Sequence, residues 1–317
     1  ACSSFGRAAP HPPPKIFRCN NMKICAACSQ ELPKDKFSKK QWQLKHHRRC
    51  KECIADNREV TVEVEASLSS ADGDGVLDED LFKHPPPRDE CPICFLPRPI
   101  DDAESQYQSC CGKILCGGCV HAAMHADNRG LCPFCRTPPP TSNREIIERL
   151  KERAGGDDAW AMYNLGCYYS DGRYGLRRNM RTAIKLWLRA GELGCTEGHH
   201  NVGNSYYDGR GVEMDAKKAE YYYELAAMMG NIRARHNLGC DEQDAGNMKR
   251  AVKHWMISAG AGYDKSLKGI REAFFNGHAT KDDFEKALRA HKEAADEMKS
   301  DQREAEIEAR RLHGSQG

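Results

Sequence analysis

Closely spaced cysteines are the residues of this sequence with the clearest chemistry. Twelve of its 17 cysteines fall into six pairs, five of them of the form Cys-x-x-Cys. Thiolates at this spacing bind a common metal ion, and soft sulfur ligands favour zinc over magnesium or calcium. Clustering into such pairs favours metal binding over a secreted disulfide framework, and so predicts an intracellular protein of the cytoplasm or nucleus. Twelve thiolates fill three four-ligand sites, so we expect three structural zinc ions per chain.

The first predicted site lies near the N-terminus, where two Cys-x-x-Cys pairs stand 21 residues apart. Its ligands would be Cys25, Cys28, Cys50 and Cys53. His46 and His47 are alternative ligands, but their Lys- and Arg-rich surroundings favour a solvated basic face. The run ELPKDKFSKKQ followed by RRCKEC, within residues 22–56, resembles the zinc domain of Stc-one-type proteins, which link RNA-silencing complexes to chromatin modifiers. This resemblance implies that the N-terminal finger docks other proteins.

The charge distribution adds an alternative partner for this basic finger. Residues 1–60 carry thirteen Lys or Arg against five Asp or Glu, whereas residues 61–90 carry two against nine. Contacts with nucleic-acid phosphates would come from Lys39, Lys40, Lys45, Arg48 and Arg49. Only Phe37 and Trp42 are placed to stack on bases, and such aromatics more often form a small core. Nucleic acid is therefore a partner that the sequence allows but does not favour.

Four more cysteine pairs occupy the middle of the chain. They are Cys91 and Cys94, Cys110 and Cys111, Cys116 and Cys119, and Cys132 and Cys135. A long first gap followed by a short one resembles the RING family, in which the first and third pairs hold one zinc ion and the second and fourth hold another. The most common RING pattern has a histidine where this chain has Cys110 and Cys111. The alternative is that only one of these two cysteines binds, with Ser109 or His121 nearby.

The resemblance to the RING family implies a ubiquitin-protein ligase. Such ligases have no covalent catalytic residue; they hold a ubiquitin-conjugating enzyme and restrain its thioester in a reactive pose. By resemblance, Ile93, Pro133 and Arg136 would contact that enzyme or its ubiquitin. Ala123 stands where many active members carry a large apolar residue, for which Met124 is a substitute. The rival hypotheses are a zinc-binding scaffold without ligase activity and a chromatin- or RNA-associated regulator.

Helical repeats follow the cysteine-rich segments. Ser142, with Glu145 three residues later, predicts a helix start, and Gly155 and Gly156 predict its end. Beyond it a short motif recurs with glycine spacings of 37 and 36 residues: Asn164-Leu165-Gly166, Asn201-Val202-Gly203 and Asn237-Leu238-Gly239. In each copy an alanine precedes an aromatic residue by four positions: Ala183 and Trp187, Ala219 and Tyr223, Ala251 and Trp255. These repeats resemble Sel-one-like repeats, relatives of the tetratricopeptide class, whose solenoids bind proteins.

The sequence as a whole predicts a mainly α-helical chain with small zinc-nucleated α+β fingers and an α-solenoid. The predicted parts are a disordered segment (1–18), a basic four-cysteine zinc finger (19–60), an acidic linker (61–88), a RING finger (89–140), Sel-one-like repeats (141–295) and a charged C-terminal helix or tail (296–317), which we expect to be solvated. We expect independent motion across the linker. The expected partners are a ubiquitin-conjugating enzyme and a protein client or adaptor on the repeats. No apolar run is long enough for a membrane span.

Overall fold

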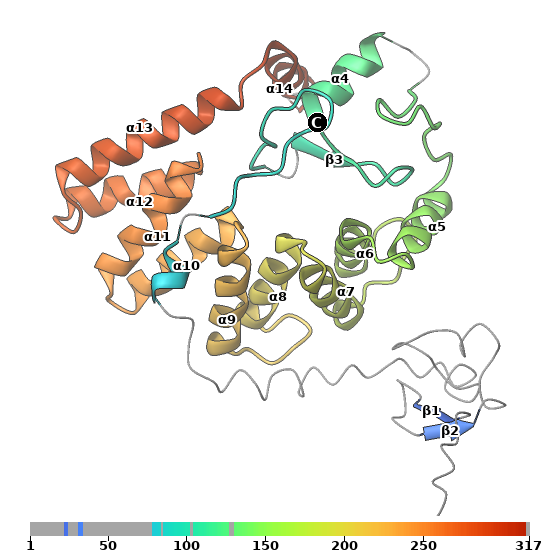
Figure 1. Ribbon diagram of the computed structural model, residues 1–317, viewed down its shortest axis with the longest axis horizontal. Helices are drawn as coiled ribbons and strands as arrows, with labels where there is room; N and C mark the ends of the chain where they lie inside the picture. Colours follow the sequence, from blue (N-terminus) through green and yellow to red (C-terminus); the bar gives the residue numbers. More distant parts are fainter. Residues whose placement is uncertain are drawn as a thin grey trace, which may run out of the picture. The chain divides into compact units, whose positions relative to one another are not determined.

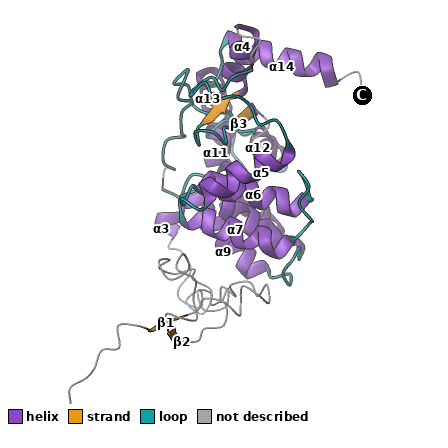
Figure 2. Cartoon of the chain, turned by 90° about the vertical axis from the view of Figure 1, so that its right-hand side faces the viewer, coloured by secondary structure: helices purple, strands orange, loops and turns teal. Residues whose placement is uncertain are grey.

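The computed structural model is mainly helical, which confirms the predicted fold class at that level (Figures 1 and 2). It describes residues 22–24, 31–33, 78–83, 85–101, 104–126 and 130–314. The chain divides into two compact units, residues 1–73 and residues 74–317. Among the described residues, no helix is both long and apolar enough to cross a membrane.

In the first unit the structure describes a short antiparallel hairpin. Strand β1 (Met22–Ile24) pairs with β2 (Glu31–Pro33), with Lys23 opposite Leu32. The four predicted zinc ligands of the N-terminal finger lie outside the described residues, as do the segment 1–18 and the basic residues considered for nucleic acid. The N-terminal zinc site therefore stays a prediction.

The second unit begins with α3 (Asp78–Leu81) and continues into the central cysteine-rich segment. There β3 (Ser105–Tyr107) pairs antiparallel with β4 (Ile114–Cys116), and α4 (Gly117–Ala126) follows β4 directly. The chain turns back between the strands at Gly112, whose φ of 72° is in the left-handed region that favours glycine. This hairpin and helix position the second and third cysteine pairs.

Helices then succeed one another to the end of the described chain (Figure 1). They are α5 (Asn143–Ala154), α6 (Ala159–Asp171), α7 (Met180–Glu192), α8 (Thr196–Asp208), α9 (Ala216–Met228), α10 (Ile232–Asp244), α11 (Met248–Gly260), α12 (Asp264–Phe275), α13 (Lys281–Glu297) and α14 (Asp301–Gly314). Side-chain caps define several starts. Ser142 accepts a hydrogen bond from the Glu145 amide, as the sequence predicts, and Asp158 caps α6 in the same way.

The recurring glycine and aromatic residue meet where the two helices of a repeat pack together. A Cβ added to Gly166 on α6 would lie 2.5 Å from Nε1 of Trp187 on α7. Likewise, a Cβ at Gly203 on α8 would lie 2.6 Å from the ring of Tyr223 on α9. Glycine is required because only a helix without a side chain at this point admits the ring so closely. The motif therefore encodes helix pairing, which confirms the predicted solenoid.

Two charged segments pack on other parts of the second unit. Of the predicted acidic linker the structure describes only the end, residues 78–83 and 85–88, and there Leu81 is 1% exposed and α3 packs on α9. The highly charged C-terminal segment was expected to be solvated, yet α14 packs on α4, and Arg303 is 6% exposed. In both cases, burial of a few side chains and backbone hydrogen bonds offset the cost of desolvating a charged segment.

Candidate metal centres

The first cysteine cluster joins a turn, a strand end and a helix start. Its members are Cys91, Cys94, Cys116 and Cys119, whose sulfur atoms all lie within 4.8 Å of one another. Cys94 Sγ and Cys116 Sγ are 3.8 Å apart. A zinc ion with four sulfur ligands at about 2.3 Å requires sulfur–sulfur distances of about 3.8 Å in a tetrahedron. The Cys94–Cys116 distance matches this value, and the cluster is able to hold a metal ion.

The second cluster contains Cys110, Cys111, Cys132 and Cys135, also within 4.8 Å of one another. Cys111 Sγ lies 3.9 Å from Cys132 Sγ, and Cys110 Sγ lies 3.4 Å from Cys135 Sγ. Both adjacent cysteines reach the cluster because the backbone turns tightly there. The amides of Cys111 and Gly112 both donate to the carbonyl of Gln108, at 3.2 and 2.7 Å.

His121 was an alternative ligand for this second site. Its Nε2 instead lies 2.9 Å from Nε2 of His125, one turn further along α4. The two clusters contain the same residues as the two interleaved sets that the RING resemblance implies. A purely sulfur donor set of this size fits zinc, and both clusters are able to hold a metal ion.

The thiols of each cluster have strongly divided pKa values. In the first cluster, burial opposes ionisation of Cys91, but backbone amides, including that of Cys116 at 3.5 Å, lower its pKa to about 7. Burial and neighbouring sulfur atoms raise the pKa of Cys119. In the second cluster, the same causes raise the pKa of Cys110, whereas hydrogen bonds with Thr137 lower that of Cys135 to about 6. Four thiolates can coexist at such distances only around a cation.

A buried arginine from the far end of the chain lies against the first cluster. Arg303 on α14 donates to the carbonyls of Pro97 at 2.9 Å and Met298 at 2.8 Å. Its Nη2 lies 3.6 Å from Cys94 Sγ. The guanidinium thus places a positive charge beside sulfurs that are negative when they bind metal. Such a neighbour orients metal ligands and stabilises their charge.

One feature of the sequence is explained by this contact, namely the two glycines of Cys116-Gly117-Gly118-Cys119. A Cβ added to Gly118 would lie 2.7 Å from the backbone nitrogen of Arg303. Glycine therefore lets the backbones of α4 and α14 approach. Gln302 adds a side-chain contact, with its Oε1 3.8 Å from Cys119 Sγ.

The central cysteine-rich segment also contacts the start of the solenoid through β3. Tyr107 donates to Asp158 Oδ2 at 2.8 Å, and Arg153 Nε donates to both Tyr107 Oη and Asp158 Oδ2, at 2.9 and 2.8 Å. Burial and the adjacent carboxylate raise the pKa of Tyr107. Burial would raise the pKa of Asp158, but hydrogen bonds from the Ala161 amide and from Tyr107 outweigh it and lower that pKa. The same carboxylate caps α6, so one group joins finger and solenoid.

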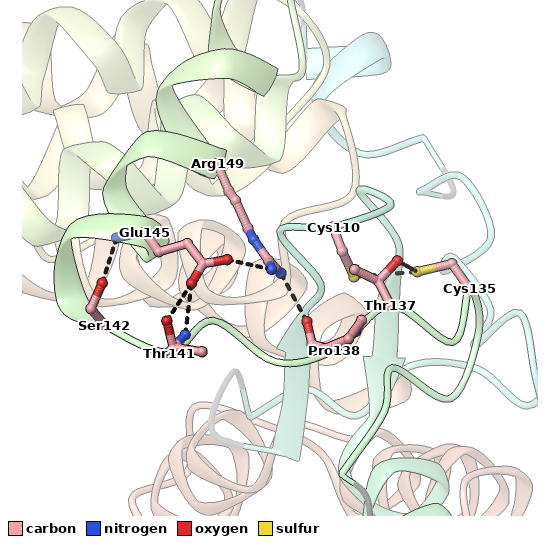
Figure 3. A network of polar contacts seen from close by, with 8 residues as sticks. All are labelled: Cys110, Cys135, Thr137, Pro138, Thr141, Ser142, Glu145 and Arg149. Carbon is pink, nitrogen blue, oxygen red and sulfur yellow. Dashed lines mark hydrogen bonds and ion pairs between the residues drawn. The ribbon is translucent and has the colours of Figure 1, made fainter.

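A proline-rich strap leads from the second cluster into α5 (Figure 3). Arg149 donates to the carbonyl of Pro138 at 3.1 Å and to Glu145 Oε1 at 2.6 Å. Glu145 Oε2 in turn accepts from the amide and hydroxyl of Thr141, at 2.8 and 2.9 Å. Hydrogen bonds therefore hold the strap to the first turns of α5.

The residues predicted to contact a conjugating enzyme lie on the loops of the clusters. Ile93 is exposed, Pro133 is half-buried, and Arg136 is exposed with a φ of 63°. Ala123 on α4 is half-buried, and its neighbour Met124 is exposed. The contact with an enzyme itself stays a prediction.

Comparison with known proteins concerns the repeats. The family model described as Sel1 repeat matches residues 161–195 and 196–231, which include most of α6 and all of α7, α8 and α9. Among solved structures, the chain is similar to a Sel1 repeat protein from Oxalobacter formigenes, at 24% identity and a TM-score of 0.43, over 49% of this chain and 64% of that one. It is also similar to a protective antigen of uropathogenic Escherichia coli strains displaying an SLR fold, at 29% identity and a TM-score of 0.41, over 48% of this chain and 33% of the other. The chain thus spans less than two thirds of each of these proteins. The family model alone places Sel1 repeats between residues 161 and 231.

Proposed function

We propose that residues 89–140 form a RING-type finger that binds two zinc ions and docks a ubiquitin-conjugating enzyme. The observation that carries this proposal is the interleaving of four cysteine pairs into two clusters, in each of which the four sulfur atoms lie within 4.8 Å of one another. Interleaving joins the loop of Ile93 and the loop of Pro133 into one small frame. When bound, zinc supplies folding free energy to this frame and no reaction chemistry.

Exposed apolar side chains on the finger support a docking role. Ile93 is 37% exposed, Phe134 is 44% exposed and Met124 is 59% exposed. Isolated apolar residues on a surface are ordinary, but several on one small metal-bound frame are typical of a binding surface. Ile93 and Phe134 belong to the first and last cysteine loops, which the RING resemblance assigns to the conjugating enzyme.

The finger would act by position alone. Ile93 and Pro133 would anchor the conjugating enzyme, and Arg136 would donate hydrogen bonds that hold its ubiquitin in a reactive pose. Restricting a thioester to reactive conformations accelerates its attack by an amine without a covalent intermediate on the ligase. The backbone of Arg136 is held in place, because its amide donates to the Cys132 carbonyl at 2.9 Å.

The Sel1 repeats would bring a protein client to the finger. Finger and solenoid are joined by the Tyr107 contacts, by the strap to α5 and by Arg303. A client on the solenoid would therefore be held at a fixed distance from the docked enzyme, which raises its effective concentration. The N-terminal basic finger would add a further docking module.

A zinc-stabilised scaffold without ligase activity is the second candidate. It is favoured by Ala123, a small residue on α4 where the family more often has a large apolar one. In this role the exposed apolar residues would bind another protein, and the Sel1 repeats would still bind a protein client.

The two candidates differ in their affinity for conjugating enzymes. We expect purified chain to bind at least one enzyme of a panel in a biolayer assay, and Ile93→Ala to weaken that binding by roughly 1–2 kcal/mol. Met214→Ala is the matched control, because Met214 is 73% exposed in a repeat turn. Equal binding by both variants would remove Ile93 from the interface and favour the scaffold.

A further inference from the structure

A one-turn helix from the acidic segment lies on the repeats as a separate element. Helix α3 packs on α9. Leu81 is 1% exposed, and Phe82 beside it is half-buried. The segment is acidic, with Asp78, Glu79 and Asp80 preceding the two apolar residues. It therefore combines a negative charge with a Leu-Phe anchor on a single helical turn.

A buried guanidinium holds the backbone of this segment. Arg235 on α10 is 2% exposed, and it donates to the carbonyls of Leu81 and Ala227. The acceptor on the segment is the backbone carbonyl of Leu81, so another segment with the same backbone conformation would satisfy Arg235 equally well. Leu81 ends its helix, where carbonyls lack partners within the helix. Burial lowers the pKa of Arg235 to about 10, so the group stays charged at neutral pH.

Basic side chains of α11 surround the ring of Phe82. Arg250 Cζ lies 5.5 Å and Lys253 Nζ 5.2 Å from its centroid, and the His254 ring centroid lies 4.6 Å away. Cations over an aromatic face attract it, and they also suit an acidic peptide. The repeat pattern on α11 uses Ala251 and Trp255, and Arg250 also forms an ion pair with Glu242 of α10. Lys253 is the cation whose described contact is the Phe82 ring.

We propose that Arg235, Arg250, Lys253 and His254 form a docking site for a partner protein through an acidic helical segment ending in Leu-Phe, and that residues 78–83 are a tethered copy of this ligand. A helical segment with adjacent apolar anchors is a recurring form of peptide recognition. The inference names the site of client docking within the proposed function, but it needs neither zinc nor ligase activity.

Tethering explains how a small contact stays occupied. A segment joined to its site by the chain acts at an effective concentration in the millimolar range. A single turn with two anchors is therefore held even if its intrinsic affinity is weak. A partner with the same anchors and further contacts would displace it, which makes the site both occupied and exchangeable.

The test is binding of a fluorescent peptide of residues 74–86 to the full chain, followed by anisotropy. Leu81→Ser with Phe82→Ser empties the site, so we expect the peptide to bind this variant at least about tenfold more tightly than wild type. Adding Lys253→Glu should weaken binding about tenfold. Lys249→Glu makes the same charge change on the same helix without a contact to Phe82, and should change it less than about twofold.

Hydrogen exchange on wild type serves if the emptied variant does not fold. Excess peptide should then increase exchange at residues 81–83, whereas a peptide with both anchors replaced by serine should not. The proposal is overturned if the peptide fails to bind a folded emptied variant, if both charge reversals weaken binding equally, or if excess peptide leaves exchange in wild type unchanged. Any of these results would make α3 a fixed part of the fold. Loss of ligase activity alone would leave this inference intact.

Discussion

Arg303→Met removes the guanidinium that joins α14 to the first cysteine cluster while keeping an unbranched side chain of similar length. The arginine makes two hydrogen bonds shorter than 3.0 Å, to Pro97 and Met298, and a third to Leu96 at 3.4 Å. A hydrogen bond from a charged donor contributes about 1.5 kcal/mol or more, so the two short ones contribute about 3 kcal/mol. Part of this loss should appear in metal affinity, because Nη2 also lies 3.6 Å from Cys94 Sγ.

We therefore expect one of the zinc ions to be bound about 10- to 100-fold more weakly, the usual effect of removing a neighbour of metal ligands. Competition with a fluorescent chelator measures this affinity directly. Arg303→Met should release one zinc ion in an early phase that is absent from the wild-type curve. Exchange of α14 amides should rise in parallel. Arg311→Met is the matched control, since Arg311 is exposed on the same helix. Identical release curves and unchanged exchange for Arg303→Met would refute the coupling of α14 to the metal site.

Three further predictions concern the second cysteine cluster, the approach of α4 to α14, and Asp241 on α10. Native mass spectrometry should show three zinc ions in wild type and two in Cys111→Ser; an unchanged count in the variant would exclude Cys111 as a ligand. Gly118→Ala should lower the free energy of unfolding by about 1–3 kcal/mol, because its Cβ would meet the Arg303 backbone. Gly260→Ala, whose Cβ would lie 3.7 Å from Ala290, should leave that free energy nearly unchanged in the same denaturation experiment. Burial and nearby carboxylates raise the pKa of Asp241 to about 6, so the folded state prefers the protonated form and stability falls as pH rises from about 4 to 6. Asp241→Asn should therefore stabilise the chain by about 1–2 kcal/mol at pH 7.5 and by almost nothing at pH 3.5; equal stabilisation at both values would contradict the raised pKa.

The repeats could be predicted because their signals are local. A glycine and the aromatic residue that packs against it lie about 20 residues apart, as with Gly166 and Trp187, and the pair recurs at a fixed period. The pairing of the central cysteines also came from spacing, since each pair lies within one turn or strand end, whereas the grouping of the pairs into two sets came from the resemblance to the RING family. Capping was predicted at Ser142 from its distance to Glu145.

The contacts that join these parts could not be predicted, because they link residues far apart without periodicity. Arg303 lies 206 residues from the carbonyl of Pro97 that it binds, and Arg235 lies 154 residues from Leu81. A run of charged residues such as α14 indicates a solvated helix unless a buried acceptor for one arginine is known. The contact of the acidic segment could not be predicted for the same reason. Its composition is that of a linker and does not show that Leu81 and Phe82 pack on the repeats.

Single-turnover discharge of ubiquitin from a conjugating enzyme tests the central claim most directly. With an enzyme that binds the chain, wild type should accelerate transfer of ubiquitin to free lysine, and Arg136→Ala should slow this transfer while leaving enzyme binding nearly unchanged. Arg144→Ala, which removes an exposed arginine from α5, should behave as wild type. No acceleration with any enzyme of a panel, together with an Arg136→Ala variant indistinguishable from wild type, would contradict the ligase role and leave a zinc-stabilised scaffold in its place.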